Sequence, residues 1–433
     1  MEMLGCGSGT NRPGVDFRLV NFVLGLKCVF CGATYSTRIP YTCPSCGVTG
    51  TLDVLYDYPA IARTMTRKAL ARRQEQTHWR YRELLPIRHD ARLPALSVGW
   101  TPLTPAPSLA RHLGVKMLYL KDDGRNPTGS LKDRASAVGV VKAHEKRQKI
   151  ISCASTGNAA SSLAGMAASM GLRSVIFIPQ RAPEAKVTQL LIFGATVLRV
   201  LGSYEDAFQL CQQACRRWGW YNRNSAINPY LLEGKKTVGL EVCEQLAWKM
   251  PGWVAVSVGD GCTIAGVWKA FREMKILGLI DRTPKMLGVQ AEGAAPITEA
   301  FRSGEAMRPV DPHTIADSIA VGVPRNWKKA VMAIRESGGA MINVSDDEIL
   351  DAMRYTGRLT GIFAEPAAAT SVAGVRAASA QGIVGPRAEV VAMVTGSGLK
   401  DIRSAQSAVN PPFDIPPDGS GLEDILCQAL PPC

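Results

Sequence analysis

The chain has 433 residues, of which 46% are hydrophobic and 20% charged, and these proportions exclude a protein that is disordered over most of its length. Its net charge of +13 indicates anionic partners, but lysines and arginines are interspersed with acidic residues, which argues against nucleic-acid binding. No stretch approaches the roughly 18 apolar residues of a membrane span. Residues 17–26 lack the charged leader of a signal peptide, so we expect a cytoplasmic protein without a membrane contact.

Two Cys-x-x-Cys pairs lie in residues 21–56, after a segment, 1–20, that we expect to be flexible. Their four thiolates have the spacing of a zinc ribbon, and four cysteines leave no open position for a substrate, so the zinc would be structural. Disulfides are the alternative, which the absence of a secretory signal disfavours. The four predicted ligands are Cys28, Cys31, Cys43 and Cys46.

The rest of the chain divides by its hydrophobic pattern. Residues 60–89 have a helical, basic pattern, and short apolar strands then alternate with amphipathic helices, which predicts open parallel sheets covered on both faces. We expect strands at 117–120, 150–154, 174–179, 196–201, 253–258, 285–290 and 389–395, and helices at 158–170, 184–193, 204–218, 237–250 and 263–277. The predicted parts are a helical linker (57–100), a large α/β domain (101–129 and 236–405), a small mobile α/β domain inserted in it (130–235) and a C-terminal tail (406–433).

One lysine lies at the junction between the first of these strands and a helix. The turn Asn-Pro-Thr-Gly at residues 126–129 leads into a helix whose first turn carries Lys132. The positive end of the helix dipole favours the free amine that Schiff-base chemistry requires. The alternative is a solvated lysine without a catalytic role, and the glycine-rich junctions described next argue against this alternative.

A second junction, residues 155–162, offers backbone amides and small hydroxyls at a helix start. Such a junction can bind a carboxylate or phosphate, although an ordinary N-cap explains it equally well. A third junction consists of Gly259, Asp260, Gly261, Cys262 and Thr263, where glycines let the backbone approach a phosphate closely. Its spacing is that of neither a Walker loop nor a dinucleotide fingerprint, so it suits a phosphate monoester.

Thr395 and Ser397 follow the last strand and place neutral hydroxyls where open α/β sheets bind ligands. Simple turn formation is the alternative explanation. Together, a lysine, a phosphate loop, an anion cradle and a terminal hydroxyl indicate pyridoxal 5'-phosphate as the cofactor.

These motifs together resemble the threonine synthase family of the fold type II pyridoxal-phosphate enzymes. The resemblance extends over roughly residues 25–405 and includes the ribbon. It implies a tryptophan synthase β-like fold of two open three-layer α/β domains after a small zinc ribbon, in a protein that forms a homodimer. The matching stretches are 126–134, 155–158, 224–225, 228–230, 232–237 and 395–401.

The resemblance also implies roles for individual residues. Lys132 would form the Schiff base and later move protons, Asn158 would bind the 3-oxygen of the cofactor ring, and residues 259–263 would hold its phosphate. Thr395 would face the pyridine nitrogen. Ser155, Thr156 and Ala159 would bind the substrate carboxylate, and Asn224, Ser225 and Lys236 its phosphate.

The activity that the resemblance implies is the conversion of O-phosphohomoserine, a small anionic amino acid, and water into threonine and phosphate. One departure concerns the substrate: Leu231 stands where the family usually has a phosphate-binding arginine. One extra residue precedes Asn228, and Ser397 replaces a frequent histidine. The alternatives are a cysteate synthase-like enzyme acting on O-phosphoserine, a threonine or serine dehydratase, a nucleic-acid-binding zinc-ribbon protein, or an inactive paralogue.

Overall fold

The computed structural model describes residues 22–429 except 39, 40, 181 and 183, so the segment 1–20 predicted to be flexible lies outside the described residues. The first described part is a three-stranded antiparallel ribbon in the order β2-β1-β3. Its strands are β1 (Val23–Cys28), β2 (Thr34–Tyr35) and β3 (Leu52–Tyr56). The two Cys-x-x-Cys pairs begin at the end of β1 and in the connection between β2 and β3.

Three short helical segments, rather than one continuous helix over residues 60–89, connect the ribbon to the α/β body. The side chains of Asp57, Thr66 and Thr77 each accept a backbone N–H at the N-terminus of one segment. Because each of these caps begins a separate helix, the helical pattern of residues 60–89 does not form one continuous helix. The segments are α1 (Tyr58–Thr64), α2 (Arg67–Ala71) and the 3-10 segment η2 (His78–Leu84).

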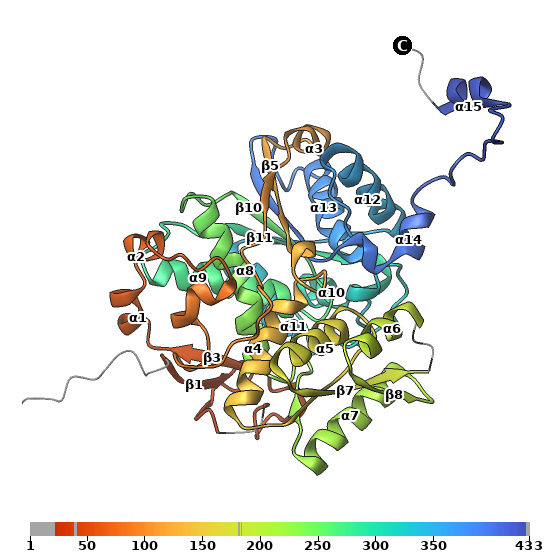
Figure 1. Cartoon of the computed structure of the whole chain (residues 1–433). Helices are drawn as coiled ribbons and strands as arrows, with labels where there is room; N and C mark the ends of the chain where they lie inside the picture. Colours follow the sequence, from red (N-terminus) through yellow and green to blue (C-terminus); the bar gives the residue numbers. More distant parts are fainter. Residues whose placement is uncertain (1–21, 39–40, 181, 183, 430–433) are drawn as a thin grey trace, which may run out of the picture.

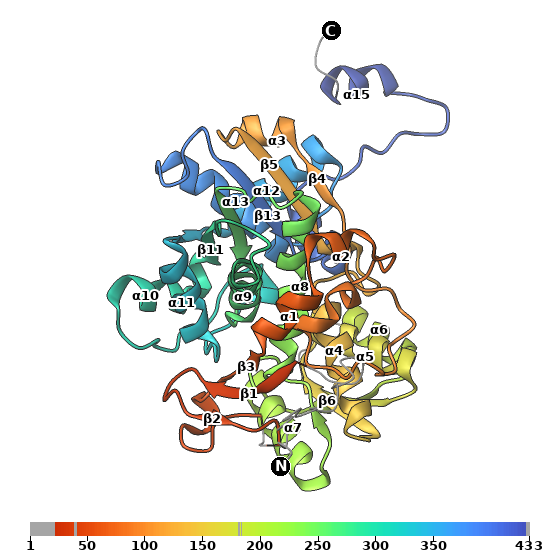
Figure 2. The same ribbon diagram turned by 90° about the vertical axis from the view of Figure 1, so that its left-hand side faces the viewer.

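Two sheets form the α/β body, as Figures 1 and 2 show from two sides. The six-stranded sheet has the order β12-β11-β10-β13-β5-β4 and is parallel except for its edge strand β4, which pairs antiparallel with β5. Its strands are β4 (Leu103–Pro105), β5 (Met117–Asp122), β10 (Trp253–Ser257), β11 (Lys285–Ala291), β12 (Ala340–Val344) and β13 (Glu389–Val394). The four-stranded sheet is parallel, in the order β8-β7-β6-β9: β6 (Ile150–Ala154), β7 (Arg173–Pro179), β8 (Thr196–Val200) and β9 (Tyr221–Asn222).

Alternate residues of the central strands enter different cores, which is what a sheet covered on both faces requires. Along β10, Val254 and Val256 join the core around α8 and α9, whereas Ala255 joins the core on the other face with α12 and α13. The predicted three-layer arrangement is therefore observed. The covering helices of the two sheets are α3 (Pro107–His112), α4 (Lys132–Glu145), α5 (Asn158–Met170), α6 (Glu184–Ile192), α7 (Tyr204–Trp218), α8 (Tyr230–Gln245), α9 (Cys262–Ile276), α10 (Pro296–Ser303), α11 (Trp327–Ser337), α12 (Asp346–Thr360) and α13 (Pro366–Ala380).

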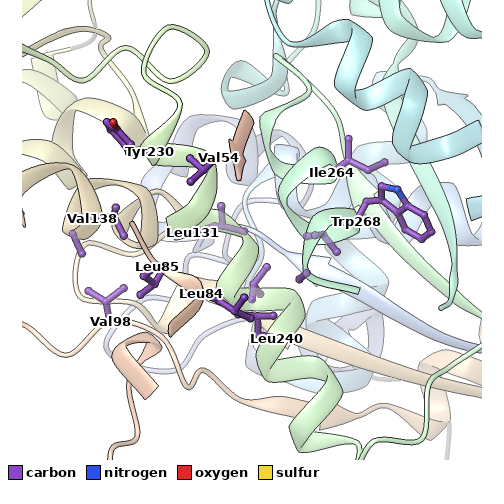
Figure 3. Close-up of a cluster of buried hydrophobic side chains, with 14 of the residues drawn as sticks. Val54, Leu84, Leu85, Val98, Leu131, Val138, Tyr230, Leu240, Ile264 and Trp268 are labelled. Atoms are coloured by element: carbon purple, nitrogen blue, oxygen red, sulfur yellow. The ribbon is translucent and has the colours of Figure 1, made fainter. Parts of the chain in front are cut away.

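Helix α8 packs between α4 and α9, and Figures 1 and 2 show it near the centre of the molecule, beside the ribbon. Each of its residues from Tyr230 to Cys243 is buried. Its predicted start at residue 237 is wrong by seven residues, because Asn228 and Pro229 begin a helix rather than a turn: the Asn228 side chain accepts the Tyr230 N–H at 3.1 Å. Figure 3 shows Leu240 of α8 with side chains that surround this helix: Val54, Leu84, Leu85, Val98, Leu131, Val138, Ile264 and Trp268.

Strands β4 and β5 lie in the large sheet with β10 to β13, and the small sheet uses strands from residues 150–222; the domain boundaries themselves stay a prediction. After residue 401 the chain forms α14 (Ile402–Ser407) and α15 (Leu422–Ala429), which have no buried residues. Figures 1 and 2 show α15 apart from the α/β body, in the predicted tail.

Candidate active site

A cavity lies where strands of the large sheet end beside the N-termini of α4 and α9. Open α/β sheets bind their ligands at this edge. The cavity brings together segments that are far apart in the sequence. The predicted site residues that line it are Lys132, Ser225, Gly259, Asp260, Gly261, Cys262, Thr263 and Thr395.

Lys132 is the first residue of α4, and its position is fixed through the backbone of its neighbour: the Leu131 N–H donates to the Thr395 carbonyl oxygen at 2.9 Å. Burial, together with the smaller effect of the positive charge of Lys235, lowers the pKa of Lys132 to about 8. Its amine is therefore partly unprotonated near neutral pH, as attack on a carbonyl carbon requires.

The turn before Lys132 is held from both sides. Gly129 adopts a φ of +82°, and its carbonyl oxygen accepts the Ser397 N–H at 3.0 Å. The Asp133 carboxylate accepts the backbone N–H of Thr128 at 2.7 Å and its hydroxyl at 2.6 Å. The turn motif and the segment after the last strand therefore position each other.

A buried set of charges anchors the start of α4. Arg134 donates to Asp123 at 2.6 and 2.8 Å and to Glu241 of α8 at 2.8 Å, and Lys121 of β5 donates to the same Glu241 at 2.7 Å. Two cations and two carboxylates balance within the protein interior, which makes their burial tolerable. These pairs tie the helix that carries Lys132 to β5 and α8.

The glycine-rich loop before α9 has the geometry of a phosphate-binding site. Gly261 has a φ of +86°, and a Cβ there would lie 2.8 Å from the Asn326 carbonyl oxygen, so only glycine fits. The first amides of α9 have no partner within the helix and are free to bind an anion. The Asp260 carboxylate accepts the backbone N–H of Arg325 at 2.7 Å. Burial raises the pKa of this carboxyl group.

Asn158, the first residue of α5, lies in a neighbouring hollow rather than in the cavity itself. The two hollows share Ser318 and Ala367, so they adjoin each other. The Asn158 amide nitrogen donates to the Glu365 carboxylate at 2.9 Å and to the Ser318 hydroxyl at 3.1 Å. Burial raises the pKa of Glu365, a residue that the sequence reasoning missed.

Five predicted substrate-binding residues are not among those that line these two hollows: Ser155, Thr156, Ala159, Asn224 and Lys236. Ser155 accepts the Gly157 N–H at 3.3 Å, as in an ordinary turn. Asn224 is buried, and its side-chain oxygen accepts the Ala154 N–H at 3.0 Å at the end of β6. In this structure Asn224 supports the backbone beside the cavity.

Lys236, predicted to bind the substrate phosphate, lies outside the cavity. Its ammonium lies 2.6 Å from Glu233 and 2.7 Å from Glu273, over the ring of Tyr56, on the side of α8 that packs against the ribbon. Lys235 lines the cavity instead. Successive residues of a helix point about 100° apart, and a helix buried on all sides gives no pattern that distinguishes two adjacent lysines.

The four ribbon cysteines form a group whose sulfur atoms all lie within 4.8 Å of one another. Cys28 and Cys46 are 3.9 Å apart, and Cys31 and Cys43 are 3.7 Å apart. This arrangement of thiols fits a tetrahedral metal ion such as zinc.

The ribbon is joined to the α/β body through α8 and α9. Lys269 of α9 donates to Glu233 at 2.8 Å and to Asp53 of the ribbon at 3.1 Å, and the Tyr56 hydroxyl donates to Glu233 at 2.9 Å. The structural ribbon therefore contacts the helix that carries Lys235 into the cavity.

The residues near the cavity that were not predicted include Arg223, Lys235, Ser318 and Glu365. Glu365 stands directly before Pro366, at the N-cap position of the alanine-rich helix α13. The lysine pair at 235 and 236 was a usable signal, although it did not indicate which of the two faces the cavity.

A family model described as pyridoxal-phosphate dependent enzyme matches residues 95–396. Among solved structures, threonine deaminase isoform 2 from Solanum lycopersicum has a TM-score of 0.62 at 23% identity, covering 72% of this chain and 88% of that one. Maize serine racemase has a TM-score of 0.60 at 23% identity, covering 69% and 88%. These structural likenesses show the fold, and the predicted fold type II architecture after a four-cysteine ribbon is confirmed.

Curated relatives are closer in sequence. The threonine synthase of Methanocaldococcus jannaschii is 41% identical over 92% of this chain and 98% of its own length. The threonine synthase of Methanosarcina acetivorans is 44% identical over 87% and 92%. The chain belongs to the pyridoxal-phosphate dependent enzymes and, within them, to the threonine synthase family.

Within the described part of the chain, none of the helices combines the length and the apolar character needed to cross a membrane.

Proposed function

We propose that this enzyme converts O-phosphohomoserine and water into threonine and phosphate by γ-elimination and β-addition. One observation carries the proposal: Lys132, the loop 259–263 and Thr395 line a single cavity in a chain that is 41% identical to a threonine synthase over 92% of its length. A dehydratase is disfavoured because a threonine synthase at 41% identity covers 92% of this chain, whereas a solved threonine deaminase at 23% identity covers 72% of it.

The residues present fit pyridoxal phosphate. The amides at the start of α9 would hold its phosphate, Lys132 would reach its carbonyl carbon, and Thr395 would face its ring nitrogen. A neutral hydroxyl at that nitrogen suits elimination and replacement better than transamination. Asn158, oriented by Glu365, would donate to the ring oxygen. When bound, pyridoxal phosphate supplies the electron sink for carbanions at the α and β carbons of an amino acid.

The protein's own groups perform the remaining steps. The Nζ atom of Lys132 removes the proton from the substrate α carbon and returns it later, which its pKa of about 8 permits. Residues 155, 156 and 159, at the start of α5, bind the substrate carboxylate as the small domain closes over the cavity. The ion pair between Arg325 and Glu205 of α7, at 3.1 Å, and the pair between Lys186 of α6 and Asp317 stabilise that closure.

The test is the absorption spectrum of the purified protein together with product analysis. We expect a yellow protein that releases phosphate and forms threonine from O-phosphohomoserine, and a Lys132→Ala variant without the visible band. A colourless wild-type protein, or one that is yellow but forms no threonine from this substrate, would refute the proposal.

A second candidate activity is β-replacement on O-phosphoserine. The observation that favours it is Leu231, a fully buried apolar residue where the family usually has a phosphate-binding arginine. Phosphate release from O-phosphoserine, with no release from O-phosphohomoserine, would select this activity.

The ribbon is proposed to hold one structural zinc ion at Cys28, Cys31, Cys43 and Cys46. Elemental analysis of the purified protein should find one zinc per chain, and substitution of two of the cysteines by serine should abolish it. The homodimer, the cytoplasmic location and the absence of a nucleic-acid partner remain predictions.

A further inference from the structure

Arg223 directly follows β9, and only 1% of its surface is exposed. Its guanidinium makes hydrogen bonds to hydroxyl groups: Nε and one terminal nitrogen donate to Ser136 at 3.1 and 2.9 Å, and Nη1 donates to Ser225 at 3.0 Å. In the described part of the chain no carboxylate forms an ion pair with it. Three of its five N–H groups are engaged in these bonds, which leaves donors for a further acceptor.

A buried guanidinium without a counter-charge is unfavourable, and burial lowers the pKa of Arg223 accordingly. The contrast with Arg134 is direct, because Arg134 is equally buried but is neutralised by Asp123 and Glu241. An anionic ligand that brings its own charge to Arg223 would remove this imbalance.

Arg223 is connected to the cavity through the two serines that it contacts. Ser225, which it contacts, lines the cavity together with Lys132. Ser136, its other partner, lies one helical turn after Lys132 in α4. The positive charge of Arg223 also contributes to lowering the pKa of Lys132.

Arg223 also lies next to the place where the family's arginine is missing. A Cβ built on Gly139 would lie 3.0 Å from Leu231 Cδ2 and 3.9 Å from Arg223 Cγ, so both side chains pack against the same point of α4. The side chains of Leu231 and Arg223 therefore occupy neighbouring positions beside α4.

We propose that Arg223, with the Ser225 hydroxyl, binds the phosphate group of the substrate and replaces the arginine expected at position 231. The inference rests on the proposed function, since it assigns the phosphate-recognition residue of that reaction. Arg223 would be a binding residue that discriminates phosphorylated from unphosphorylated amino acids, and a fork of two N–H donors suits that task.

The experiment compares two ligands in the wild type and in Arg223→Gln, using the visible spectrum of the holoenzyme to measure binding. O-phosphohomoserine carries the phosphate, whereas L-threonine shares the amino and carboxylate groups and lacks it. We expect Arg223→Gln to weaken phosphohomoserine binding by about 100-fold or more and L-threonine binding by less than about threefold. Arg199→Gln, at an exposed position of β8, controls for the loss of one positive charge and should change neither.

A relocation variant keeps the test decisive if Arg223→Gln does not fold. In Arg223→Leu/Leu231→Arg the arginine moves to the position used by the family, and phosphohomoserine binding should return to within about tenfold of wild type. Equal losses for both ligands, unchanged phosphohomoserine binding, or a folded relocation variant without recovery would overturn the proposal. A wild-type enzyme that forms no threonine would instead refute the proposed function, and inorganic phosphate then serves as the probe for Arg223 by the same comparison.

Discussion

Replacing Gly234 with alanine tests whether the close crossing of α4 and α8 positions the reactive lysine. A Cβ at Gly234 would lie 2.1 Å from the Arg134 carbonyl oxygen, whereas real Cβ contacts are not shorter than 3.0 Å. The two helices must therefore separate by about 0.9 Å at this point. Arg134 is two residues from Lys132, so the displacement reaches the catalytic amine directly.

We expect Gly234→Ala to lower the free energy of unfolding by about 1–3 kcal/mol, as overpacking does. A misplacement of about 1 Å in a reacting group lowers the rate by about 100-fold, and kcat/KM for threonine formation should fall by that order. Urea unfolding and steady-state phosphate release measure the two effects.

Gly357→Ala is the matched control, because Gly357 also lies within a helix, α12, and a Cβ there meets nothing within 4 Å. It should raise stability by up to about 1 kcal/mol and leave kcat/KM unchanged. If Gly234→Ala behaves like this control, the helix crossing does not position Lys132.

Three further predictions concern charge and metal. In cofactor-free protein, the rate at which Lys132 captures pyridoxal phosphate should rise with pH through a midpoint near 8, because the lowered pKa makes the free amine available there; a midpoint above about 10, measured by stopped-flow absorbance, would contradict the burial argument. Lys269→Met removes the ammonium group that pairs with Asp53 and Glu233, and should lower the free energy of unfolding in urea by about 3–5 kcal/mol. Its control, Lys275→Met, lies at an exposed position of the same helix and should change this free energy by less than about 0.5 kcal/mol. Cys43→Ser should remove the ribbon zinc and lower the melting temperature, and an unchanged zinc content by elemental analysis would show that Cys43 is not a ligand.

Local junctions were the most predictable features of this protein. Lys132, Gly261 and Thr395 each lie where a strand ends or a helix begins, and turn chemistry together with apolar runs identifies such places directly from the sequence. The strand 150–154 and the helices 158–170 and 204–218 were predicted with the bounds that the structure has.

Features that depend on tertiary surroundings were not predictable. The choice between Lys235 and Lys236 is made by Glu233 and Glu273, which neutralise Lys236 within the interior. The proximity of Arg223 to the cavity depends on its contact with Ser136, which is 87 residues away in the sequence. Helix α13 is buried along most of its length, so it lacks the amphipathic pattern that reveals surface helices.

The position of β13 within the large sheet has a consequence for how the protein is made. Residues 389–394 pair on one side with β10 and on the other with β5, so they separate the N-terminal part of the sheet from its remaining strands. The small sheet, built from residues 150–222, has all its strands as soon as that segment leaves the ribosome. Strand β5, by contrast, can pair with its parallel neighbour β13 only after nearly the whole chain has been synthesised. The turn that carries Lys132, which is anchored to Thr395, therefore assembles last, and in a nascent chain the side of β5 opposite β4 stays unpaired until translation is almost complete.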